Sequence, residues 1–168
     1  MNKQFLVLLI FVLGSIPVIS QTTEQVDSMN NPQMVVGKVS REMIQQGDFG
    51  NHFINEYATY QPDSETNNQL KNKIYNVSIV IVMATWCSDS QMQVPRFYKI
   101  LDQLDYNTNQ IDLICVDRQK TGGTTDISSL EVDFVPTFIF YRNGDEIGRI
   151  IESPEISLEK DALLILSK

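Results

Sequence analysis

The sequence predicts an α/β fold in which a mixed β-sheet is covered by helices on both faces. Strand-like and helix-like segments alternate along the second half of the chain, after a helical N-terminal stretch. One apolar strand leads directly into an amphipathic helix, which indicates a parallel crossover. Asn143-Gly144 lies between two further strand-like segments and indicates an antiparallel hairpin. The 168 residues suit one domain with one core, once a leader is set aside.

Residues 1–20 have the pattern of an export signal peptide. Lys3 precedes an apolar run from Phe5 to Ile19, and this run is shorter and more interrupted than a typical membrane span. We expect cleavage after Ser20, with a retained N-terminal anchor as the alternative. The prediction is an exported bacterial protein, periplasmic or secreted, that has no stable membrane association after signal cleavage.

Residues 21–39 are expected to form a flexible leader, because Gln21 to Pro32 is polar and has no apolar period. Residues 40–168 are expected to form the domain, beginning with a helical extension over 40–74. Two short helices are predicted there, followed by a third that Ser64 caps and that extends toward Ile74. The apolar residues at helical spacing that predict the first two are Met43, Ile44, Phe49, Phe53, Ile54 and Tyr57, with Gly47 and Gly50 as interruptions.

The remaining elements follow from apolar periodicity and turn signals. Val77 to Ala84 is apolar on both faces and β-branched, as expected for a central strand. The other predicted strands are Ile111–Val116, Val135–Tyr141 and Glu146–Ile151, and the predicted helices are Ser88–Leu104, a short one near Ile127–Leu130, and Glu155–Leu166.

Composition excludes several classes of function. Thirteen Lys and Arg against twenty-one Asp and Glu give a formal charge of −8, and the basic residues are scattered, so nucleic acid and anionic membranes are poor partners. His52 is the only histidine and lies far in sequence from Cys87, which argues against a cysteine–histidine hydrolase. One histidine and two cysteines do not form a zinc site, so no metal and no cofactor is expected.

The candidate reactive group is the thiol of Cys87, where the central strand ends and a helix begins. The first-turn N–H groups and the helix dipole favour the thiolate form, while the nearby Asp89 opposes it. Ser90 follows one helical turn later and is placed to donate a hydrogen bond to the thiolate.

Several segments in this order and spacing resemble the thioredoxin family, over roughly Ile74 to Leu166. They are the strand ending in Ala84-Thr85-Trp86-Cys87, the strand ending in Val116-Asp117, the Val135-Pro136-Thr137 segment, and the hairpin Tyr141 to Glu146. Pro95 is similar to the proline that kinks the corresponding helix in the family. The resemblance implies a thioredoxin-like three-layer fold. The stretch before it resembles the helical extension of exported bacterial thioredoxin-like proteins.

The resemblance also implies roles for particular residues. Cys87 matches the attacking cysteine, and Pro136 matches the cis-proline that faces it. The neighbouring Val135 and Trp86 are then the expected substrate contacts, with an extended peptide pairing to the backbone beside the proline. Two departures matter. Ser90 stands where the family usually has its second cysteine, and Ile81 stands where many members bury an aspartate.

The expected function is therefore that of a monothiol thiol-disulfide oxidoreductase acting through a mixed disulfide on Cys87. Its partners would be protein disulfides or thiol adducts, with a low-molecular-weight thiol or a reductase completing the reaction. Cys115 is the internal candidate for a resolving thiol, and a small buried core residue is the alternative for it. Two other functions stay open: a non-enzymatic polypeptide-binding module that uses the surface at Pro136, and a redox sensor that uses Cys87 and Cys115.

Overall fold

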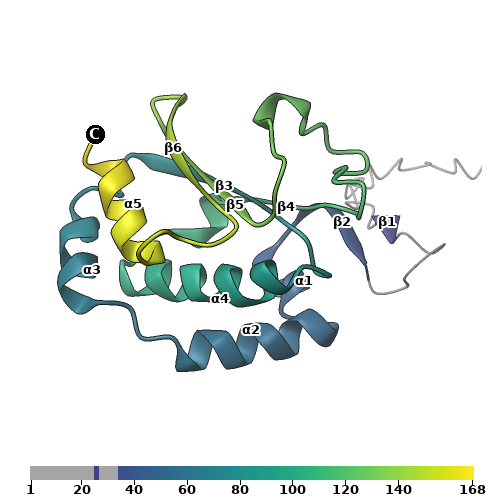
Figure 1. Ribbon diagram of the computed structural model, residues 1–168, viewed down its shortest axis with the longest axis horizontal. Coiled ribbons are helices and arrows are strands. Elements are labelled where there is room, and N and C mark those ends of the chain that lie inside the picture. The colour runs from purple at the N-terminus through teal and green to yellow at the C-terminus, as the bar shows by residue number, and fades with distance from the viewer. Residues whose placement is uncertain (1–24, 27–33) are drawn as a thin grey trace, which may run out of the picture.

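The computed structural model describes residues 25–26 and 34–168, and it contains a mixed sheet with the strand order β1-β2-β4-β3-β5-β6 (Figure 1). The central β3 pairs parallel with β4 and antiparallel with β5. The strands are β1 Gln25–Val26, β2 Val35–Val39, β3 Val77–Met83, β4 Asp112–Cys115, β5 Thr137–Arg142 and β6 Asp145–Ile151. The predicted α/β fold with a mixed sheet is confirmed.

Alternate residues of β3 belong to two separate apolar clusters, one on each face of the sheet. Ile79, Ile81 and Met83 are part of the larger cluster, whereas Val80 and Val82 belong to the smaller one. Successive side chains of a strand point to opposite faces, so a strand that is apolar throughout must be covered on both.

All five α-helices contribute to the larger cluster, which corrects the expectation of helices on both faces. They are α1 Arg41–Ile44, α2 Gly47–Thr59, α3 Ser64–Lys71, α4 Ser88–Gln103 and α5 Leu158–Leu166. Figure 1 shows α2 and α4 side by side beneath the sheet. The smaller cluster is covered instead by the segment 117–135, whose helical part is the 3-10 turn η2 Ser128–Leu130. That segment is too polar and glycine-containing to supply an apolar helical stripe.

The flexible leader predicted over 21–39 is contradicted at the residues that the structure describes, because Gln25–Val26 forms β1 and Val35–Val39 forms β2, which pairs antiparallel with β1 and with β4. The five residues of β2 contain a glycine and a lysine, and their partner β4 lies far along the chain, so no local pattern marks them as a strand. The signal peptide predicted over 1–20 lies outside the described residues. Among the helices that the structure describes, none is both long enough and apolar enough to cross a membrane.

Helix boundaries follow their capping groups. The carboxylate of Asp63, rather than the predicted Ser64, caps α3 by accepting from the Thr66 N–H at 2.8 Å. Helix α5 begins at Leu158 and not at Glu155. The Asp161 carboxylate accepts the backbone N–H of Glu155 at 2.6 Å, which holds that residue outside the helix.

Polar contacts join the N-terminal helices to α4. The Arg41 guanidinium donates to both carboxylate oxygens of Asp102, at 2.8 and 2.7 Å, and the Tyr57 hydroxyl donates to the same carboxylate at 2.6 Å. Arg41 also lies over the rings of Phe53, Tyr57 and Tyr98. The helical extension is therefore packed as part of the domain.

Candidate active site

Cys87 lies in the short connection between β3 and α4, where the backbone turns from strand to helix. It is the N-cap residue of α4, with extended backbone angles, and its N–H donates to the Ala84 carbonyl at 3.1 Å. The side chain makes no capping hydrogen bond and is half-buried against the smaller apolar cluster. The sulfur is therefore held at the start of α4 and remains partly accessible to solvent.

The loop that precedes β5 faces this sulfur. The Cys87 thiol donates a hydrogen bond to the Val135 carbonyl, with 3.2 Å between Sγ and the oxygen. The peptide bond between Val135 and Pro136 is cis. Two hydrogen bonds hold this loop in place: the Thr137 hydroxyl donates to the Phe134 carbonyl at 2.7 Å, and the Glu152 N–H donates to the Pro136 carbonyl at 2.7 Å.

Trp86 packs beside Cys87 against the same cluster. Its indole Nε1–H donates to the Val116 carbonyl at 3.3 Å, just beyond the end of β4. The structure thus brings together four of the residues singled out from the sequence: Trp86, Cys87, Val135 and Pro136.

Ser90 differs from its expected role. Its side chain is completely buried, and its Oγ accepts the backbone N–H of Ala84 at 3.2 Å. Within the described part of the chain, Ser90 makes no hydrogen bond to the Cys87 sulfur. The hydroxyl of Ser90 therefore fastens the first turn of α4 to the end of β3.

Cys115 is not placed to resolve a disulfide on Cys87. It is fully buried in the larger apolar cluster, on the opposite side of the sheet from the cluster that Cys87 contacts. Burial raises the pKa of its thiol to about 12. Of the two hypotheses for Cys115, the structure supports a small buried core residue. A redox sensor would require Cys87 and Cys115 to lie together, and the structure places them against different clusters.

Comparison with known proteins agrees with this geometry. The family model named Thioredoxin matches residues 60–163, which is more than half of the chain. This chain belongs to the thioredoxin family. It is 32% identical over 103 residues to the Dictyostelium discoideum protein "Putative thioredoxin-5", a match that covers 61% of this chain and 92% of that protein. Membership of the thioredoxin family indicates a thiol–disulfide redox function in general.

Two solved structures share the thioredoxin-like fold at low sequence identity. One is a protein of unknown function from Pseudomonas aeruginosa, 16% identical with a TM-score of 0.51. The other is an HIV epitope scaffold, 14% identical with a TM-score of 0.52. Each match covers 73% of this chain and 84% of the other, and at these identities it supports the fold alone.

A loop with two basic residues, Arg118 and Lys120, borders this thioredoxin-family site. Residues 117–121 close on themselves, because the Asp117 N–H donates to the Thr121 carbonyl and the Lys120 N–H donates to the Asp117 carbonyl, each at 3.1 Å. The Asp117 carboxylate accepts from the Thr121 N–H, the Thr121 hydroxyl and the Gln119 N–H. Burial alone would raise the pKa of Asp117, and these hydrogen bonds outweigh it and lower the pKa.

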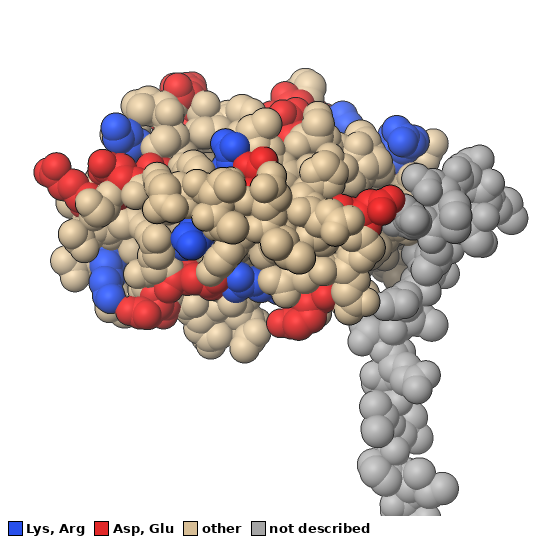
Figure 2. All heavy atoms as spheres, turned by 90° about the horizontal axis from the view of Figure 1, so that it is seen from below, with Lys and Arg blue, Asp and Glu red and all other residues tan. Residues whose placement is uncertain are grey.

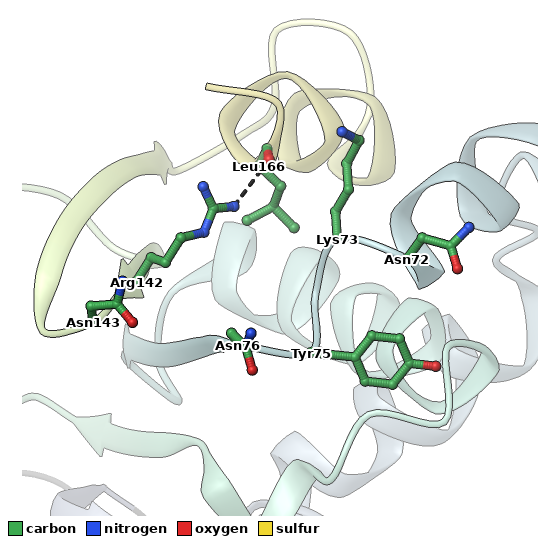
Figure 3. Close-up of a pocket in the computed structure, with 7 residues that line it drawn as sticks. All are labelled: Asn72, Lys73, Tyr75, Asn76, Arg142, Asn143 and Leu166. Carbon is green, nitrogen blue, oxygen red and sulfur yellow. Dashed lines mark hydrogen bonds between the residues drawn. The ribbon is translucent and has the colours of Figure 1, made fainter.

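Within residues 34–168, no cluster of three or more His, Cys, Asp or Glu side chains could hold a metal ion. A pocket of about 280 Å³ lies at the opposite end of β3 from Cys87, where Lys73, Asn76 and Arg142 are among the lining residues (Figure 3). On the face shown in Figure 2, basic side chains lie in separate groups among acidic ones.

Proposed function

We propose that this protein is an exported thioredoxin-like thiol–disulfide exchange protein that reacts through Cys87 alone. The observation that carries the proposal is the contact between the Cys87 sulfur and the Val135 carbonyl, next to the cis peptide bond at Pro136. It keeps a partly accessible sulfur beside the backbone that thioredoxin-family proteins use to hold a substrate peptide. Export rests on the signal pattern of residues 1–20.

The proposed reaction is an exchange of disulfide bonds. The Cys87 thiol loses its proton to solvent, and the thiolate attacks one sulfur of a substrate disulfide. A new S–S bond to Cys87 forms as the substrate S–S bond breaks. The other substrate sulfur leaves as a thiolate and takes up a proton, so no net oxidation or reduction occurs in this step.

Release of the substrate requires a second thiol that this site does not supply. Ser90 has no sulfur, and Cys115 is buried in the cluster on the other side of the sheet. A second cysteine of the substrate, or a low-molecular-weight thiol, would attack the mixed disulfide and restore the Cys87 thiol. In that step the thiol attacks the substrate sulfur and Cys87 leaves as a thiolate, so the product is a substrate with a rearranged disulfide, or one with a disulfide to the small thiol and one free thiol.

The test is formation of a covalent adduct with a small protein that contains one accessible disulfide, followed by intact-mass measurement. We expect one adduct on the wild-type protein and on Cys115→Ala, and none on Cys87→Ser. Labelling in denaturant should detect two thiols in the wild type and one in each variant, which verifies that every accessible thiol is counted.

The same experiment separates exchange from simple binding. If the disulfide protein binds Cys87→Ser as tightly as the wild type and no mixed disulfide forms with either, the polypeptide-binding function replaces the exchange function. An adduct on Cys115 of the folded protein would contradict the proposed route in a different way, because it would require a sulfur that the structure buries.

A further inference from the structure

We infer that the exchange reaction of Cys87 is directed toward polypeptides that carry acidic residues next to their half-cystine. The inference rests on the proposed function and adds the class of substrate. Two cations, Arg118 and Lys120, lie over the aromatic rings of Trp86 and Phe134, the residues that precede Cys87 and Val135 in the sequence. They give the rim of this site a positive character in a chain whose formal charge is −8.

Trp86 and Phe134, which carry the two rings, are sequence neighbours of the two residues joined by the hydrogen bond from Cys87 to Val135. Trp86 precedes Cys87, the donor, and Phe134 precedes Val135, the acceptor. Arg118 Cζ lies 5.1 Å from the centre of the Trp86 ring, and Lys120 Nζ lies 5.1 Å from the centre of the Phe134 ring. Each partner of the Cys87–Val135 hydrogen bond is thus preceded by an aromatic residue with a cation over its ring.

The positions of both cations are set by the loop 117–121. The Asp117 side chain and backbone hold the loop closed, as described above. Lys120 has a φ of 61°, in the left-handed region that favours glycine, so a lysine there is not the residue that the backbone itself prefers. Its Nζ donates to the Asp133 carbonyl, which fixes the ammonium next to Phe134.

Within the described residues no carboxylate lies at ion-pair distance from either of these two cations, and the contact of Lys120 Nζ with Asp133 is to its backbone carbonyl. The ion pairs there involve other residues, and Arg118 and Lys120 are in none of them. Asp117 is the acid closest to them in sequence, and its carboxylate is occupied by donors of its own loop. Asp89 lies in the first turn of α4 and is the acid closest to Cys87 in sequence. Because neither Arg118 nor Lys120 is in an ion pair, carboxylates of a substrate can pair with both cations.

Phe134 supports a polypeptide as the occupant. Its side chain is 51% exposed although it is a large apolar group at the edge of the site. A short peptide can cover this ring with an apolar side chain while its acidic side chains contact the cations. A small anionic disulfide offers carboxylates but no such apolar group.

The test compares three peptides of equal length, each with one cysteine held as a mixed disulfide with 2-mercaptoethanol. The flanking residues are Glu, Gln or Lys. The measured quantity is the rate at which the Cys87–peptide disulfide forms at low ionic strength, divided by the rate of the same peptide with a neutral small thiol. At low salt we expect the Glu peptide to exceed the Lys peptide by about ten-fold, and the ratio to fall as salt is added.

Matched variants assign the preference to the loop. Arg118→Gln with Lys120→Gln should abolish it, whereas Arg118→Lys with Lys120→Arg should keep it, because the charges remain. Lys73→Gln removes a cation at the opposite end of β3 and should leave the preference intact. A preference that survives in the double Gln variant, or that disappears equally in Lys73→Gln, overturns the inference.

The remaining outcomes are also decisive. Equal normalised rates for the three peptides overturn the inference and leave the exchange function standing. No Cys87 adduct with any peptide overturns both. The last outcome is that glutathione disulfide reacts with Cys87 faster than a neutral small disulfide does, with the loop variants removing this difference in rate and the three peptides reacting equally. In that case the cations bind a small anionic thiol, and the assignment to polypeptides is wrong.

Discussion

The hydroxyl of Ser90 satisfies a backbone N–H that the core would otherwise leave without a partner. Ser90 is completely buried, and the N–H that it accepts belongs to Ala84, which is itself buried. Leaving a buried donor unsatisfied costs about 1–3 kcal/mol. We therefore expect Ser90→Ala to lower the free energy of unfolding by about that amount in urea titrations. The rate of Cys87 adduct formation should change little.

Ser88→Ala is the matched control, since Ser88 is exposed in the same turn of α4 and its loss should cost little. A large fall in the adduct rate of Ser90→Ala with unchanged stability would instead restore the catalytic role that the spacing from Cys87 suggested.

The individual residues at the site differ in how far sequence could identify them. Cys87 and Pro136 lie in short motifs whose spacing is characteristic, so their neighbourhood could be predicted. The contacts of Arg118 and Lys120 could not be predicted, because they depend on a loop closed by Asp117 and on rings that come from two other segments. No pattern in the sequence around Arg118 and Lys120 predicts those contacts.

At the level of elements, Asp102 connects α4 to the N-terminal helices through Arg41 and Tyr57. Burial alone would raise the pKa of Asp102, but the hydrogen bonds from these two residues and the Arg41 charge outweigh it and lower the pKa. We expect Asp102→Asn to lower the free energy of unfolding at neutral pH by about 1.5–3 kcal/mol, because it removes charged hydrogen bonds.

The pH dependence of that loss has a definite sign. A folded pKa below the unfolded value of ~3.9 means that the Asp102 contribution is complete above that pH and disappears as the pH falls through the folded pKa. The stability difference between wild type and Asp102→Asn should therefore shrink below about pH 4. Asp105→Asn, which removes an exposed ion pair with Lys71, serves as the control and should have a small effect at every pH. A difference that stays constant down to pH 2 would show that the Asp102 charge is unimportant.

Among the elements, the sequence predicted those whose signal is local. The β-branched run of β3 and the apolar stripe of α4 each contain a full period of their own structure. Strand β2 was missed because its five residues are ordered by pairing with β4, through Gly37 opposite Cys115 and Val39 opposite Leu113. Long-range pairing of this kind leaves little trace in the strand itself.

Over the whole molecule, the sheet separates the two cysteines into different chemical environments. Cys87 borders the smaller apolar cluster and is partly accessible, while Cys115 lies within the larger cluster and is not. Cys115 shares a face of β4 with Leu113, as strand alternation requires, but the sequence did not show that Cys87 lies against the other face of the sheet. The tertiary arrangement makes one thiol available for reaction and turns the other into a reporter of global unfolding.

That separation predicts how stability responds to alkaline pH. Burial raises the pKa of Cys115 to about 12 in the folded protein, against about 8.5 in an unfolded chain. Below about pH 8.5 both states keep the proton, so the contribution of the buried thiol is complete. Above it the unfolded chain ionises and the folded protein does not. The contribution therefore falls by about 1.4 kcal/mol per pH unit until the folded pKa is reached.

Comparison with Cys115→Ala isolates this effect, because every other titrating group is present in both proteins. Whatever the substitution costs at pH 8, we expect the wild type to lose about 2 kcal/mol relative to the variant between pH 8 and pH 10, measured by urea unfolding in the presence of a reductant. Over the same range, alkylation of Cys115 should proceed only as fast as the molecule unfolds, whereas Cys87 reacts in the folded state. Parallel stability profiles for the two proteins, together with rapid alkylation of Cys115 under native conditions, would mean that this sulfur is open to solvent on the opposite side of the sheet from the site.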